Sequence, residues 1–194
     1  MKKLLITGFE PFGGETINPA WEAVKALPDT LGNYTLYKKE IPVIYGEAAE
    51  AVLEAASEIS PDGILCVGQA GGRDAVMPER IAVNIRDAGI CDNAGNRRWG
   101  QRIAQAGAAA YFATVPVERM AAAILAAGLP GRVSNSAGTF VCNDTLYTLL
   151  HHFDGTGVRV GFLHVPYLPE QGSPSLPLPN TVSALEAAIS ALDE

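Results

Sequence analysis

Residues 1–15 read MKKLLITGFEPFGGE, and this stretch decides how the chain begins to fold. The apolar residues 4–6 lead through Thr7 into Gly8, which is typical of a buried strand that feeds a glycine-rich turn. Nucleotide-binding proteins often place their phosphate loop after such a strand. A nucleotide-binding α/β protein is therefore the first hypothesis that the stretch raises.

The details of the turn argue against a phosphate loop. The position where a lysine would meet the phosphates holds Gly14, and the anionic Glu15 follows it. A carboxylate at that place would repel a phosphate. We therefore interpret the turn as a tight loop that presents Phe9 and Phe12, and we keep nucleotide binding as an alternative that a thermal shift with ATP would reveal.

The segments that follow alternate between helix and strand. A helix is expected from Asn18, which serves as N-cap before Pro19, and buried strands follow at 34–43 and after the turn at 61–63. Further helices are expected at 46–59, 116–127, 141–153 and 181–192, a strand and turn at 132–140, and a strand with its exit loop at 158–170. Residues 71–107 lose periodicity and are interpreted as an inserted excursion near the active face.

This order predicts one α/β domain over residues 1–194, a three-layer α/β/α sandwich with a mostly parallel twisted sheet. In such folds ligands bind outside the carboxyl ends of the strands. The loops at Gly8, Gly68, Asn135 and His164 should therefore converge.

Composition excludes several classes of protein. The net charge of −7 and the pI near 5.0 argue against a nucleic-acid surface, and no segment has the roughly 20 apolar residues of a membrane span. The first residues imitate a signal peptide, but the apolar run stops at a turn and no small-residue cleavage site follows. Three cysteines without CxxC spacing fit a reducing cytoplasm and exclude an obvious zinc site.

Cys142 is the strongest candidate for a reactive group. It stands at the start of a predicted helix, where unpaired amides and the macrodipole lower the pKa of a thiol. A buried structural cysteine explains that position equally well. His164 favours catalysis, because it ends a predicted strand on the same face and could serve as the base. His151 and His152, in the last turn of a helix, are interpreted as surface residues.

A cysteine and histidine pair needs a third group that orients the imidazole. The best placed carboxylate is Glu79, in the stretch MPERIAVN. Asp74 and Asp87 compete with it on the residues alone, and spacing does not decide among the three.

Four ordered motifs carry a family resemblance: GFEPFGG with Asn18 and Pro19, GQAGGR followed by ERIAVN, SNSAGTFVCN, and GFLHVPYLPEQ. Together they resemble the pyrrolidone-carboxylate peptidases, also called pyroglutamyl peptidases of type I. The resemblance implies a cytoplasmic thiol protease without a cofactor, often a homotetramer, that hydrolyses peptides to release an N-terminal L-pyroglutamyl residue. It places the catalytic residues at Cys142, His164 and Glu79, which decides among the carboxylates.

The implied mechanism is a thioester route, with the Cys142 amide as an oxyanion donor and a second donor that the sequence does not identify. An uncharged lactam needs apolar walls and a few backbone polar groups, without a metal. Walls are expected from the aromatic residues Phe9, Phe12 and Phe140 and from the aliphatic residues Val141 and Ile90, for which core packing is the alternative. Gln69 is expected to supply a backbone partner to the lactam.

The sequence departs from the family pattern at one place. Where the family usually reads DARIPDN, this chain has Gly89 in place of the arginine and Cys91 in place of the proline. We expect either slower catalysis or another cation, Arg86 or Arg73, in the role of the missing one. A weakened relative that only binds pyroglutamyl termini is the alternative. Cys91 is interpreted either as an exposed oxidisable thiol or as part of a subunit contact.

Overall fold

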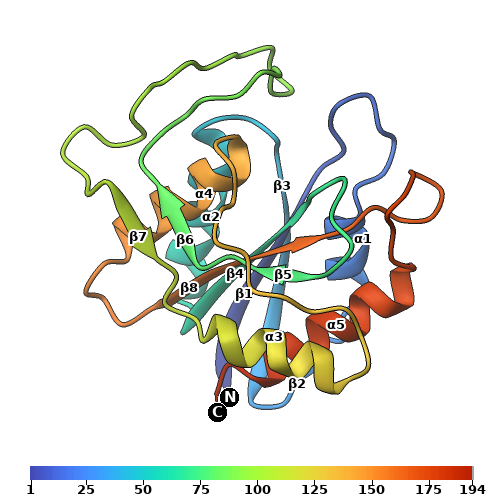
Figure 1. Ribbon diagram of the computed structural model, residues 1–194. Helices are drawn as coiled ribbons and strands as arrows, with labels where there is room; N and C mark the ends of the chain where they lie inside the picture. The colour runs from blue at the N-terminus through green and yellow to red at the C-terminus, as the bar shows by residue number, and fades with distance from the viewer. Residues whose placement is uncertain (194) are drawn as a thin grey trace.

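A mostly parallel sheet forms the centre of the computed structural model, which describes residues 1–193 (Figure 1). The strand order is β2-β3-β1-β4-β8-β5, and β3, β1, β4 and β8 run parallel. The short edge strands β2 and β5 are antiparallel to their neighbours. The bounds are β1 Lys2–Phe9, β2 Thr30–Leu31, β3 Tyr34–Ile41, β4 Gly63–Gln69, β5 Met77–Pro78 and β8 Arg159–Val165.

The first helix begins where the sequence provides a start signal. α1 is capped by Asn18, whose side-chain oxygen accepts from the Ala20 amide at 3.0 Å, with proline in the first turn. α2 follows Gly46, and the left-handed Ser60 ends it. The helices are α1 Pro19–Ala26, α2 Glu47–Ile59, α3 Val117–Ala126, α4 Val141–His152 and α5 Leu178–Ser190.

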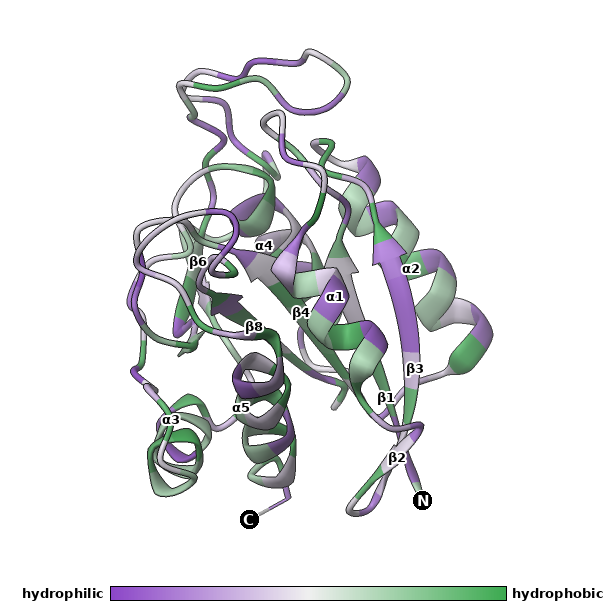
Figure 2. Ribbon diagram, turned by 90° about the vertical axis from the view of Figure 1, so that its right-hand side faces the viewer, coloured by the Kyte–Doolittle hydropathy of each residue, from purple (hydrophilic) through white to green (hydrophobic). Residues whose placement is uncertain are grey.

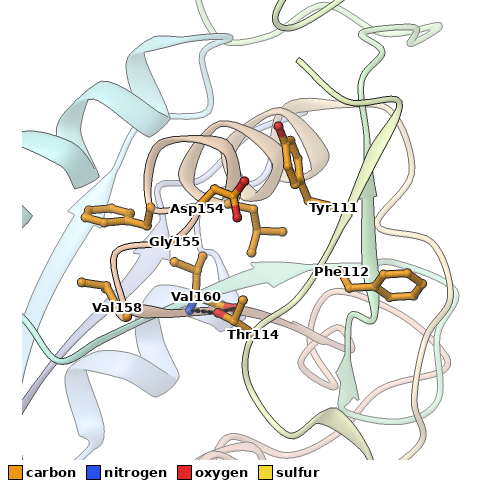
Figure 3. Close-up of a pocket in the computed structure, with 10 residues that line it drawn as sticks. Tyr111, Phe112, Thr114, Asp154, Gly155, Val158 and Val160 are labelled. Atoms are coloured by element: carbon orange, nitrogen blue, oxygen red, sulfur yellow. Dashed lines mark hydrogen bonds between the residues drawn. The ribbon is translucent and has the colours of Figure 1, made fainter.

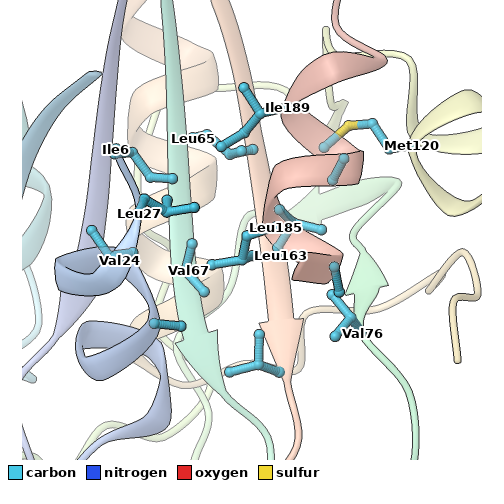
Figure 4. Packing of buried hydrophobic residues seen from close by; sticks show 14 of the residues in the cluster. Ile6, Val24, Leu27, Leu65, Val67, Val76, Met120, Leu163, Leu185 and Ile189 are labelled. Carbon is cyan, nitrogen blue, oxygen red and sulfur yellow. The ribbon is translucent and has the colours of Figure 1, made fainter. Parts of the chain in front are cut away.

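Two apolar cores, one on each face of the sheet, confirm the three-layer sandwich. α1, α3 and α5 cover one face, over side chains that include Leu65, Val67 and Leu163 (Figure 4). α2 and α4 cover the other face, over Cys66 and Phe162. Each helix carries both green apolar and purple polar positions, as expected for helices with one buried and one exposed face (Figure 2). The alternation of faces along each strand explains why neighbouring residues enter different cores.

The excursion after β4 is irregular, as expected, and contains only short strands. β6 (Ile81–Val83) pairs with β7 (Ala110–Phe112) as a separate two-stranded ribbon. Asn84 organises the loop between them, because its side chain accepts from two backbone amides and donates to three carbonyl oxygens at residues 103–108.

The prediction of a strand within residues 132–140 is wrong. Within it Ser134 makes an isolated bridge with Glu79, and Gly131, just before it, makes another with Val76. Five of its nine residues, 134–138, are Ser, Asn, Ser, Ala and Gly, whose small or turn-forming side chains contribute little to a packed strand. It serves instead as a loop that leads into α4.

Gly161, in the middle of β8, provides a test of the packing. A Cβ built on Gly161 would lie 2.4 Å from Cγ2 of Val115, whereas a Cβ on Gly89 meets no atom within 4 Å. We expect Gly161→Ala to lower the free energy of unfolding by about 1–3 kcal/mol, because a packed core does not accept an extra methyl without strain. Urea unfolding measures the change. Gly89→Ala is the control, and equal stability of the two variants would contradict the packing described.

Candidate active site

The carboxyl ends of the central strands bring distant segments together. β1 ends at Phe9, β4 at Gln69 and β8 at Val165, and they are neighbours in one parallel sheet. The convergence expected for the loops is therefore found at this edge. α4 begins beside it, so the first turn of a helix faces the strand ends.

Cys142 lies in the first turn of α4, against β4. Gly68 makes this approach possible, since a Cβ at that position would be 3.1 Å from Cys142 Sγ and 2.8 Å from the Phe162 ring. Gly68 is also the register partner of His164 across the β4 and β8 pair. Paired residues in parallel strands point to the same face. Cys142 and the His164 imidazole therefore share one face of the sheet.

His164 is held by a buried carboxylate. Its Nδ1 donates to Glu79 Oε1 at 2.6 Å, and both side chains are almost completely buried. This contact leaves Nε2 as the ring nitrogen that is free to exchange a proton. The Glu79 backbone amide donates to Phe162 O at 2.9 Å, which fixes the carboxylate beside β8.

The competing carboxylates lie elsewhere. Asp74 is exposed and pairs with the Arg132 guanidinium. Asp87 is exposed, and its backbone amide donates to Thr139 O at 3.0 Å. Neither aspartate places its carboxylate beside the His164 imidazole, so the geometry favours Glu79 among the three candidates.

The pKa values of the three groups follow from burial and from mutual contact. Burial of Glu79 would raise its pKa, but the hydrogen bond from His164 and the charge of Arg73 hold it below its usual value. Burial lowers the pKa of His164 more than the contact with Glu79 raises it. The resting state is therefore a neutral imidazole beside an ionised carboxylate.

The prediction that the helix start lowers the pKa of Cys142 is wrong. Burial, together with the negative charge of Glu79, raises the pKa of Cys142 to about 12. The helix start does favour a thiolate, but a partly buried sulfur loses hydration that the first-turn amides do not replace. The free thiol therefore remains protonated at neutral pH.

Apolar side chains line the approach to Cys142. Phe9, Phe12, Phe140, Val141 and Cys142 belong to one apolar cluster. The Phe12 and Phe140 rings are 6.3 Å apart between centroids. Val141 and Phe9 are almost fully buried, so they also serve the core, while Phe12 and Phe140 remain partly exposed. The two partly exposed rings are best placed to meet a ligand.

Ile90 and Gln69, which the sequence also predicts to contact the ligand, are placed differently from the aromatic residues. Ile90 is 53% exposed and lies outside the apolar cluster of residues that includes Cys142. Gln69 is buried at the end of β4, and its side-chain oxygen accepts from Gln171 Nε2 at 3.0 Å, so that oxygen already has a partner. Cys91 is an exposed free thiol in the described chain, and Gly89 lies in open space.

The sequence interpretation missed one residue that docks the ribbon onto α4. Asn143 is fully buried beside Cys142, and its side chain accepts from Val83 N and donates to the oxygens of Val83 and Ile85. An asparagine inside the first turn of a helix, next to a candidate nucleophile, was the available signal. Its contacts fix the turn that carries the thiol.

A surface hollow lies away from this edge (Figure 3). Tyr111 and Thr114 line it together with Val158 and Val160, at the amino end of β8. Since Cys142 and His164 lie at the opposite end of the strand, the hollow does not belong to their site.

Within residues 1–193, no three acidic, cysteine or histidine side chains are grouped so that they could bind a metal ion. None of the helices in this range has the length and apolar character of a membrane span.

Comparisons with known proteins agree with this geometry. The family model described as pyroglutamyl peptidase matches residues 2–194. A pyrrolidone-carboxylate peptidase of Levilactobacillus brevis is 50% identical over 98% of this chain and 97% of its own length, and one of Yersinia pestis is 46% identical over 98% and 92%.

Solved structures give the same picture. The pyroglutamyl peptidase I of Bacillus amyloliquefaciens has a TM-score of 0.96 at 43% identity, covering 99% of this chain and 97% of its own. The pyrrolidone carboxyl peptidase of Thermococcus litoralis has a TM-score of 0.94 at 36% identity, covering 99% and 93%. The match extends over nearly the whole sequence and the whole fold, and the chain belongs to the pyroglutamyl peptidase family.

Proposed function

We propose that this protein is a cysteine peptidase that removes N-terminal L-pyroglutamyl residues from peptides, with Cys142 as nucleophile, His164 as base and acid, and Glu79 as orienting carboxylate. The observation that carries the proposal is the 2.6 Å contact between His164 and Glu79, on the face of the sheet where Cys142 Sγ lies against Gly68. The family of the chain supports the reaction.

The reaction proceeds in two halves. His164 Nε2 takes the proton of Cys142 as the sulfur attacks the carbonyl carbon that joins pyroglutamate to the next residue. The imidazolium then gives that proton to the departing amine, and a thioester remains. Water, deprotonated by His164, attacks the thioester, and the proton returns to the Cys142 sulfur as pyroglutamate leaves.

Glu79 stabilises the imidazolium between these steps. The developing oxyanion is met by backbone amides in the first turn of α4, among them that of Cys142, because these amides have no partner within the helix. The positive end of the helix dipole adds to this stabilisation at the moment when charge appears.

The pocket proposed for the substrate matches an uncharged ring. Phe12 and Phe140 supply flat apolar walls, with Phe9 and Val141 behind them and Ile90 on the loop outside. The backbone of Gln69, at the end of β4, is proposed to bind the lactam. A free N-terminal ammonium would lose its hydration between these rings without gaining a carboxylate partner.

We further propose one functional domain over the full length of 194 residues, in a cytoplasmic homo-oligomer that is a tetramer by family resemblance. Exposed aromatic side chains support subunit contacts, since Phe112 is 68% and Trp99 is 60% exposed. The net charge of −7 makes nucleic acid an unsuitable partner.

Removal of the sulfur tests the proposed nucleophile. Cys142→Ala should reduce hydrolysis of a pyroglutamyl arylamide by at least about 10³-fold, because the other thiol on this face, Cys66, is fully buried and cannot replace it. The release of arylamine measures the rate. Cys91→Ala, which removes an exposed thiol, is the matched control and should retain activity. A Cys142→Ala variant that keeps its activity would refute the mechanism.

The raised pKa of Cys142, about 12, predicts how its reactivity depends on pH. Below that pKa the thiolate fraction grows about tenfold for each pH unit, so the rate of inactivation by iodoacetamide should rise steadily between pH 6 and 9. A preformed thiolate and imidazolium pair would instead give a constant rate over this range. The measurement uses the Cys91→Ser background, in which Cys142 and the fully buried Cys66 are the remaining thiols, so that the accessible active-site thiol is followed.

A further inference from the structure

The Arg73 guanidinium joins two parts of the site. Its Nη1 donates to Glu79 Oε1 at 2.7 Å and to Ser134 Oγ at 3.2 Å. Its Nη2 donates to Ser136 O at 3.0 Å. Glu79 orients His164, and residues 134–136 belong to the loop that leads into Cys142. One planar side chain therefore contacts both the Glu79 carboxylate and the loop that precedes the candidate nucleophile.

Arg73 also supplies the permanent positive charge for a buried anion. The Glu79 side chain is fully buried, and an unpaired carboxylate in such a place is costly. His164 is neutral at rest, so it contributes a hydrogen bond rather than a charge. Among residues 1–193, Arg73 is the only arginine in a salt bridge with Glu79.

Other nearby arginines have different partners. Arg86 Nε lies 2.6 Å from Asp144 Oδ1, and Arg132 pairs with Asp74. The two cations that the sequence left open are thereby distinguished, because Arg86 is held by a carboxylate outside the catalytic group. Arg73 alone of the two touches Glu79.

We propose that Arg73 is a positioning residue for catalysis: it holds Glu79 against His164, ties the 134–136 loop to the same point, and by its charge keeps the imidazole neutral until it accepts the Cys142 proton. This inference rests on the proposed function. It assigns Arg73 no contact with the substrate, since its side chain contacts Glu79, the loop and the Met77 sulfur.

The direction of the charge effect follows from the groups around His164. Glu79 favours the imidazolium, whereas Arg73 opposes it. Cys142 on α4 is a neutral thiol, as is Cys66 on β4, whose pKa burial raises to about 12. Without Arg73, the Glu79 charge acts alone and the pKa of His164 rises. Between the old and the new pKa, His164 would then be protonated and unable to accept a proton.

The test compares pH profiles of kcat/KM for a pyroglutamyl arylamide. In Arg73→Met, the acid limb should move to higher pH by about one unit, and kcat should fall at the optimum. In Arg73→Lys, the limb should stay near that of the wild type while kcat falls, because lysine keeps the charge but not the planar fork. Arg132→Met removes an equal charge from an exposed pair and should leave the profile unchanged.

A direct titration makes the proposal independent of turnover. The His164 ring is followed by NMR in the full chain, with Arg73→Gln as a second uncharged variant should Arg73→Met fold poorly. A higher His164 pKa in the uncharged variants, and not in Arg73→Lys, supports the inference. An unchanged or lower pKa, or an equal shift in Arg73→Lys, overturns it. Failure of the wild type to cleave the arylamide would instead refute the proposed function, while the titration still decides the charge effect.

Discussion

The burial of the Glu79 carboxylate is the constraint on which the site depends. A fully buried anion must receive hydrogen bonds and a compensating charge, and here one oxygen accepts from both His164 and Arg73. Arg73 lies six residues before Glu79, whereas His164 lies 85 residues after it. The need to satisfy one carboxylate therefore fixes the turn after β4, the end of β8 and the loop before α4 relative to one another.

The sheet supplies the frame within which these contacts form. β4 and β8 are adjacent and parallel, so Gly68 and His164 lie side by side although 96 residues of sequence separate them. The absence of a side chain at Gly68 leaves the space that the Cys142 sulfur occupies. A larger residue would push the first turn of α4 away from the imidazole. The glycines that resembled a phosphate loop near residue 13 have a different use, since Gly13 and Gly14 take the positive φ of a tight turn beside Phe12.

The sequence predicts the helices and central strands of this protein better than its irregular segments. Strong periodicity and an N-cap such as Asn18 act locally, so the helices and central strands were found within a few residues. The loop at 132–140 was mistaken for a strand because its role depends on contacts with Arg73 rather than on local pattern. The choice of Glu79 over Asp74 likewise required the fold or the family resemblance, since local spacing does not reveal which carboxylate is buried beside a histidine.

Cys142 and His164 are uncharged in the resting state because burial disfavours the charged form of each side chain. A helix start lowers the pKa of an exposed thiol, but the Cys142 sulfur lies close to the ionised Glu79, and burial favours the uncharged form. A thiolate made in advance would have to persist beside that anion. If the proton instead moves to His164 during attack, the negative charge passes from sulfur to the carbonyl oxygen near the helix amides, and Glu79 meets the imidazolium as it forms. In the proposed mechanism, this arrangement stabilises charge where it develops in the reaction rather than in the free enzyme.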